Sequence, residues 1–226
     1  MNKKAPKKKK RDYGNDYVSV TDVLNAIRKP GLEMWFKMHS KEECDALSKK
    51  AKEIGTQLHA LIESYVKGEE GSVKTLYQDE VNTALKSFLK FRKEHPNIRL
   101  EWAELKISNC VLELNGTIDC IGEESGKRVL IDWKTGECKG KEKPEIYPEY
   151  LLQVGGYALL YDRCKDTKDI IDKAYIVVLA KDKEAYSLKE ISKDMLTTSS
   201  DVFFCLLAYV TIKKDLEKMM KESCTK

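Results

Sequence analysis

The stretch LIDWKTG, residues 130–136, places an acid and a lysine two positions apart inside an apolar run. Ile131 and Trp133 are typical of a buried strand, in which side chains alternate between the two faces. Asp132 and Lys134 therefore share one face, and Trp133 points to the other with Ile131. Asp and Lys are rarely buried unless they are paired or bound to a metal. The stretch thus carries either a salt bridge at a strand end or part of a functional site.

The preceding stretch NGTIDCIG, residues 115–122, favours the functional site. Alternation places Asp119 on the face opposite Ile118 and Cys120. If the two stretches are adjacent antiparallel strands, Asp119 and Asp132 lie side by side, and their carboxylates repel. A divalent cation relieves this repulsion, and oxygen ligands suit Mg²⁺ or Mn²⁺. A lysine beside such a metal either helps to deprotonate an attacking water or neutralises charge on a phosphate.

The periodicity along the chain predicts an α/β fold with a mixed sheet. Helical patterns are expected at residues 19–27, 42–66, 77–94, 148–161 and 199–222. Strand patterns are expected at residues 98–108, 110–121, 127–135 and 173–180, with GEESGK as the hairpin loop between the second and third. Three sequential strands predict an antiparallel meander, and a helical crossover then permits a parallel strand.

The composition is that of a soluble globular protein with one domain. Of 226 residues, 42% are hydrophobic and 35% charged. No run approaches about 18 apolar residues, so neither a membrane span nor a membrane partner is expected. The seven cysteines are scattered and include no C-x-x-C. This pattern predicts a reducing cytosol rather than a disulfide framework or a zinc site.

The positive charge is concentrated at the N-terminus. The chain has 41 Lys and Arg, of which seven lie in residues 1–11; the remaining 34 face 37 Asp and Glu. We expect residues 1–16 to be a disordered basic tail and residues 17–226 to be a single domain. The tail either binds polyanions such as DNA or, less favoured, directs nuclear import. Its candidate DNA-binding residues are Lys7, Lys8, Lys9 and Lys10.

Three motifs together resemble the PD-(D/E)XK nuclease superfamily: G-T-I-D, I-D-W-K-T-G and Q-V-G-G-Y. More narrowly, they are similar to its RecB-like exonuclease branch, which includes phage exonucleases and the mitochondrial genome maintenance exonuclease. The similarity runs from about Ser19 to about Lys181. It implies a restriction-endonuclease-like core, with a central mixed sheet flanked by helices.

The resemblance also implies a role for each matching residue. Asp119 resembles the first metal-binding acid, Asp132 the second, and Lys134 the catalytic lysine. The main-chain carbonyl of Trp133 is implied as a further ligand. One or two Mg²⁺ or Mn²⁺ ions are expected. An iron–sulfur cluster is not expected, because the chain has no tight cysteine triplet.

Gln153 and Tyr157 match the Q-x-x-x-Y motif of the branch. Residues i and i+4 lie on one helical face, which here either reaches the DNA backbone or the lysine, or only packs. Gly155 and Gly156 each cost a helix about 1 kcal/mol relative to Ala. We expect them to allow close approach of the helix to the sheet or the substrate.

His59 lies in GTQLHALIE, residues 55–63, which resembles the G-x-x-x-H motif of the branch. The resemblance implies that His59 helps to bind metal, and Glu63, one turn on, is its expected hydrogen-bond acceptor. Alternation places Glu104 on one face with Trp102 and Lys106. Glu104 either reaches the metal site or faces solvent.

These observations predict a metal-dependent DNA exonuclease that acts on single-stranded or end-containing DNA. The alternatives are a structure-specific endonuclease for flaps or junctions and a non-catalytic DNA-binding module of the same fold. Trp35 and Phe36 either stack on bases or, as favoured, pack in the core. We expect a monomer in the cytoplasm, at the nucleoid or in a viral host cell.

Overall fold

The computed structural model describes residues 17–27, 30–164 and 169–223. The expected basic tail, residues 1–16, lies outside this range, and with it the candidate residues Lys7, Lys8, Lys9 and Lys10.

The described strands form one mixed sheet in the order β1-β3-β4-β5-β6, with β2 paired to β3. They are β1 (Val18–Ser19), β2 (Arg99–Asn109), β3 (Leu114–Glu124), β4 (Lys127–Gly136), β5 (Lys173–Ala180) and β6 (Tyr186–Ile191). Strands β2, β3 and β4 are antiparallel, and β5 is parallel to β4. The predicted meander, crossover and mixed sheet are confirmed.

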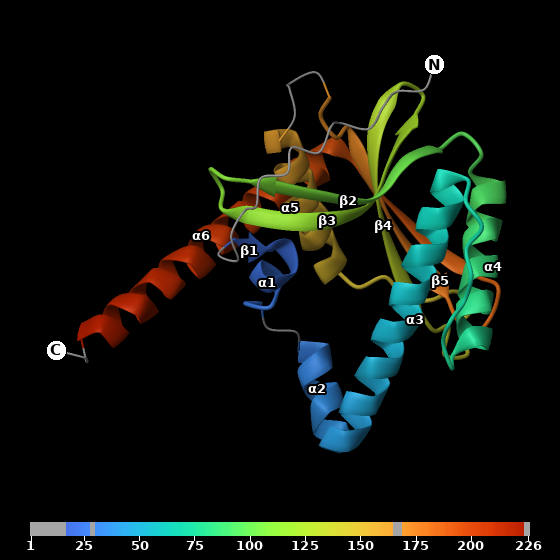
Figure 1. Cartoon of the computed structure of the whole chain (residues 1–226), viewed down its shortest axis with the longest axis horizontal. Helices are drawn as coiled ribbons and strands as arrows, with labels where there is room; N and C mark the ends of the chain where they lie inside the picture. Colours follow the sequence, from blue (N-terminus) through green and yellow to red (C-terminus); the bar gives the residue numbers. More distant parts are fainter. Residues whose placement is uncertain (1–16, 28–29, 165–168, 224–226) are drawn as a thin grey trace.

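Helices cover both faces of the sheet (Figure 1). They are α1 (Val20–Leu24), α2 (Pro30–Met38), α3 (Lys41–Lys67), α4 (Gln78–Glu94), α5 (Glu149–Cys164) and α6 (Lys193–Ser223). On one face, α3 and α4 pack on the sheet through Leu58, Phe88 and Phe91, which contact Trp133 and its neighbours. The other face is covered by α1, α5 and α6.

Two strand boundaries differ from the sequence prediction because of local turns. The side-chain oxygen of Asn109 accepts hydrogen bonds from the N–H groups of Val111 and Leu112, each 2.9 Å long, and the turn delays β3 to Leu114. The loop between β3 and β4 is only Ser125 and Gly126, both with positive φ. Two such residues form the tight turn that suits a twisted hairpin.

The glycine pair of α5 packs against α6, not against the sheet or the substrate as expected. A Cβ at Gly155 would lie 2.5 Å from the Ser199 backbone, and one at Gly156 would lie 2.6 Å from the Phe203 ring. The missing side chains therefore allow the two helices to touch.

We expect Gly156→Ala to lower the free energy of unfolding by about 1–3 kcal/mol, because the added methyl overpacks the α5–α6 contact. Gly55→Ala is the matched control, since its Cβ would be 3.8 Å from Thr135 Oγ1, an ordinary contact. That change should raise stability by up to about 1 kcal/mol through helix propensity. Urea unfolding measures both, and equal effects would contradict the packing argument.

Helix α6 begins at Lys193, six residues before its predicted start. It is the one helix of the described chain that could cross a membrane by length and composition alone. A mostly buried core helix can pass the same test, but 28% of the apolar window of α6 is buried, with Leu196, Phe203 and Leu207 in the core. Its C-terminal part extends past the body (Figure 1) and exposes apolar side chains such as Ile212 and Leu216.

Phe36 does not pack in the core. It lies on α2 and is 50% exposed, so the favoured prediction for this residue is wrong. The side chain of Trp35 lies outside the described part of the structure.

Candidate active site

The site forms where β3 and β4 separate. Their last paired residues are Cys120 and Ile131. Asp119 and Asp132 are the next residues on the two strands, and β4 continues its pairing with β5 as far as Gly136. The opening is bridged by the Trp133 N–H, which donates a 2.9 Å hydrogen bond to Asp119 Oδ2. Both acids therefore lie at the fork between the strands.

Side-chain alternation breaks at this point in two adjacent strands. In β2, Trp102 and Leu105 pack in the same cluster, although they are three residues apart, and Glu104 between them has φ of 49°. A positive φ is uncommon for a residue with a side chain, and such conformations concentrate at functional sites. Trp102 and Glu104 do not share a face, so that prediction is wrong.

The break in β3 matches the break in β2. Ile118 and Ile121 pack with the α5 side, whereas Cys120 packs with the α3 side. Asp119 is thus opposite Ile118 but not opposite Cys120, which corrects the simple alternation. The paired breaks turn Glu104 and Asp119 toward α3, where His59 is located.

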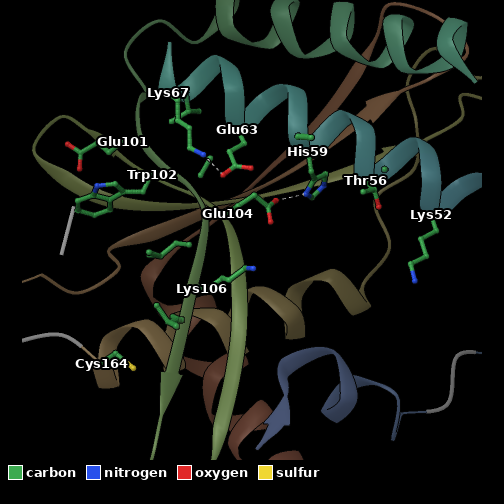
Figure 2. Close-up of a pocket in the computed structure, with 16 residues that line it drawn as sticks. Lys52, Thr56, His59, Glu63, Lys67, Glu101, Trp102, Glu104, Lys106 and Cys164 are labelled. Atoms are coloured by element: carbon green, nitrogen blue, oxygen red, sulfur yellow. Dashed lines mark hydrogen bonds and ion pairs between the residues drawn. The ribbon is translucent and has the colours of Figure 1, made fainter. Parts of the chain in front are cut away.

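His59 lies beside three oxygen atoms. Its Nδ1 lies 3.1 Å from Glu104 Oε1, a contact drawn in Figure 2, and 3.6 Å from Asp119 Oδ1. Its Nε2 lies 3.2 Å from the Trp133 carbonyl. Burial lowers the pKa of His59, but the hydrogen bond to Glu104 and the charge of Asp119 outweigh it and raise the pKa overall.

The prediction that Glu63 accepts a hydrogen bond from His59 is wrong. Glu63 forms a 2.6 Å ion pair with Lys67, one turn further along α3, and Glu104 takes its place beside the imidazole. Glu104 therefore belongs to the site, and the alternative of a purely solvent-facing charge is excluded.

Asp132 and Lys134 form the other half of the site. They share a face of β4 as predicted, with Lys134 Nζ 2.5 Å from Asp132 Oδ2, and Asp132 is 1% exposed. Its Oδ1 has no hydrogen-bond partner among the described residues. Burial lowers the pKa of Lys134, but Asp132 and Asp119 raise it overall, so the lysine is a cation.

The two acids influence each other as the sequence suggested. Burial, and then the negative charge of Asp132, raise the pKa of Asp119 to about 6. The cations His59 and Lys134 and the Trp133 N–H lower it but do not cancel these effects. The arrangement contains more negative charge than its own cations neutralise.

Helix α5 contributes three polar side chains beside the fork. Gln153 Nε2 donates a 3.2 Å hydrogen bond to Tyr157 Oη, and Tyr157 is 5% exposed. The charge of Asp119 helps, after burial, to raise the pKa of Tyr157. Lys134 Nζ lies 5.4 Å from the centre of the Tyr150 ring. Sequence reasoning missed Tyr150, although it precedes Gln153 by one turn on the same helical face.

The residues fit a hard divalent cation. Ligand atoms of His59, Glu104 and Asp119 all lie within 4.8 Å of one another. Asp132 adds a buried carboxylate with an unpaired oxygen, and the Trp133 carbonyl points at the same imidazole. Carboxylate and carbonyl oxygens with one imidazole are suitable ligands for Mg²⁺ or Mn²⁺.

The family model described as the PD-(D/E)XK nuclease superfamily matches residues 73–222. The chain belongs to this superfamily, a class of nucleases whose typical cofactors are divalent metals. The match includes Asp119, Asp132 and Lys134, whereas His59 lies before it. A search of the curated proteins found no match.

Several solved structures are similar to this chain at low sequence identity. A putative exonuclease from Eubacterium rectale is 12% identical, with a TM-score of 0.59; the match covers 95% of this chain and 88% of that one. The alkaline exonuclease LHK-Exo from Laribacter hongkongensis is 12% identical, with a TM-score of 0.46, and the match covers 93% and 94% of the two chains. The structure of LHK-Exo in complex with dAMP is 13% identical, with a TM-score of 0.43, and the match again covers 93% and 94% of the two chains.

Proposed function

We propose that this chain is a metal-dependent deoxyribonuclease that degrades DNA from free ends. The observation that carries the proposal is the convergence of His59, Glu104, Asp119 and the Asp132–Lys134 pair on the fork between β3 and β4. Acids and a lysine meeting in this way, in a member of a nuclease superfamily, support phosphodiester hydrolysis.

The ion would be held by Asp119, Asp132, His59 and the carbonyl of Trp133, with Glu104 beside His59. One or two Mg²⁺ or Mn²⁺ ions would be held in this way, with Asp132 as one of the carboxylate ligands. Such an ion, when bound, polarises a phosphoryl oxygen and lowers the pKa of a water molecule.

The chain's own groups bind and orient the substrate around this centre. Lys134, held as a cation, neutralises negative charge on the phosphate and fixes the attacking water by hydrogen bonding. Tyr150 restricts the position of its ammonium group. Gln153 and Tyr157 hold each other through their hydrogen bond, and their polar ends orient the DNA backbone or the lysine.

The choice of an exonuclease rests on the resemblance of the motifs to the RecB-like branch. A sequence-specific endonuclease normally needs additional base-reading elements. The non-catalytic alternative is disfavoured because both acids and the lysine are present.

With Mg²⁺, we expect linear DNA labelled at its 5′ or 3′ end to be degraded while covalently closed circles persist, because a strict exonuclease needs an end. EDTA should stop the reaction, and excess Mg²⁺ or Mn²⁺ should restore it. Gel analysis of matched linear and circular DNA measures both. Equal cleavage of the circle would favour the structure-specific endonuclease instead, and DNA binding without cleavage would favour the non-catalytic module.

A further inference from the structure

A groove of about 1100 Å³ runs between α3 and β2, with the His59–Glu104 pair in its lining. Figure 2 shows Lys52 from α3 and Lys106 from β2 in this lining, together with His59 and Glu104. The groove is therefore continuous with the candidate active site, and a bound molecule can occupy both.

Two lysines in the lining of the groove have no acidic partner in the described part of the chain. Each carboxylate in its lining lies against a basic side chain: Glu63 against Lys67, Glu101 against Arg99 and Arg128, and Glu104 against His59. Lys52 and Lys106 are both exposed and form no ion pair with any residue of the described chain. Two cations thus remain for an anionic ligand.

The two lysines lie on opposite walls of the groove, and each is only a few residues along the chain from His59 or Glu104. Lys52 precedes His59 by seven residues, or about 10 Å along a helix. Lys106 follows Glu104 by two residues, or about 7 Å along a strand. Lys106 also lines a second hollow of about 610 Å³, which reaches Thr117 and Tyr157. An elongated ligand can therefore continue past Lys106.

The other lining residues of the groove suit nucleobases. The lining includes Leu105 and Ile107 of β2 and Val66 of α3; the two β2 side chains also pack in part against the core on the α5 side. A channel that combines cations for the backbone with apolar surface for bases is characteristic of single-strand binding. Pockets that bind drug-sized ligands measure about 300–1000 Å³, so this groove has room for a few nucleotides of one strand.

We propose that the α3–β2 groove binds single-stranded DNA on the substrate side of the active site, and that Lys52 and Lys106 contact phosphates that flank the scissile one. This inference rests on the proposed function and adds the path and the strandedness of its substrate. Both lysines are positioning residues: they bind the strand and do not touch the reacting atoms.

The test compares Lys52→Ala, Lys106→Ala and their double variant with wild type. The matched control is Lys127→Ala, an exposed lysine in the β3–β4 hairpin, outside the groove. Fluorescence anisotropy of a labelled oligodeoxythymidine in EDTA gives Kd at several salt concentrations, and cleavage with Mg²⁺ gives kcat and KM. A blunt hairpin duplex serves as the competing ligand.

We expect each single groove variant to weaken binding roughly three- to tenfold, because one phosphate contact is lost. The slope of log Kd against log salt concentration should fall by about one for the same reason. KM should rise by a similar factor while kcat remains near the wild-type value. Lys106→Arg, which retains the charge, should recover most of the affinity.

If the groove variants bind DNA with the same Kd as Lys127→Ala and the protein cleaves DNA, the proposed binding groove is wrong and the proposed function stands. Loss of affinity in a protein that never cleaves would support the groove and overturn the nuclease. If the hairpin duplex binds more tightly than the oligodeoxythymidine and depends on the same lysines, the proposal that the groove binds single-stranded DNA is wrong. A wild-type protein that does not bind DNA would overturn both proposals.

Discussion

Lys134→Ala should reduce DNA cleavage by roughly 10²–10³-fold or more, because it removes the ammonium group that Asp132 holds in the fork and that neutralises charge on the phosphate. The same change should cost about 3–5 kcal/mol of stability, since it leaves the carboxylate of Asp132 buried without its partner. A loss of activity alone is therefore ambiguous between chemistry and folding.

A second variant separates these two effects. Lys134→Met combined with Asp132→Asn removes both charges and keeps the side chains close to their original volumes. We expect this double variant to recover most of the lost stability, because neutral groups replace a buried ion pair at little cost. Its nuclease activity should remain absent, which would assign the activity loss to the missing lysine and acid and not to unfolding.

The matched control is Lys141→Ala. Lys141 forms a 3.2 Å ion pair with Glu145, and both side chains are more than half exposed, so its loss should cost no more than about 1 kcal/mol. Activity should be unchanged. Chemical denaturation and single-turnover cleavage measure both properties. Wild-type cleavage rates in Lys134→Ala would remove the lysine from the mechanism.

The central part of the site could be predicted from sequence because strand periodicity is regular there. In β4, Asp132 and Lys134 share a face and Ile131 and Trp133 share the other, as alternation requires. The boundaries of helices α3 and α4 could also be predicted from the sequence to within one residue. Ser40 caps α3 with Glu43, and Gly68 ends it with φ of 71°; these are the residues that helix ends favour.

The position of Glu104 could not be predicted, because it depends on a backbone conformation that the sequence does not require. A glutamate at φ of 49° has no sequence signature, and it reverses the facing of the residues around it. The assignment of Glu63 to His59 failed for a related reason. Helical spacing allowed the contact, but Lys67 competes for Glu63, and a strand distant in sequence supplies the acceptor instead.

Strand β6 was missed because its hydrophobic pattern is weak. In YSLKEI, only Tyr186 and Ile191 are buried, and the four residues between them are polar or partly exposed. The strand pairs with β5 along a single edge. Its formation thus depends on the tertiary partner β5 more than on intrinsic propensity.

Asp119→Asn should abolish cleavage and yet stabilise the metal-free protein by about 1–3 kcal/mol. The pKa of Asp119 is raised from 3.8 to about 6 by burial and by Asp132. The folded protein therefore binds this proton more tightly than the unfolded chain does. The stability cost of ionisation grows as the pH rises from about 4 to 6 and is complete above that range. A neutral amide avoids this cost and still accepts the Trp133 N–H.

Added Mn²⁺ should reverse the order of stability. At a concentration 1,000 times Kd, the ion should stabilise wild type by about 4.1 kcal/mol, which exceeds the advantage of Asp119→Asn in the metal-free protein. It should leave Asp119→Asn almost unchanged, since a ligand charge is missing. Asp201→Asn, an exposed change on α6, should behave as wild type with and without the ion. Thermal unfolding of the three proteins at pH 7.5, each with EDTA or with Mn²⁺, measures all six cases. If Mn²⁺ stabilised Asp119→Asn as much as wild type, the ion would be binding elsewhere, and the fork between β3 and β4 would not be the metal centre.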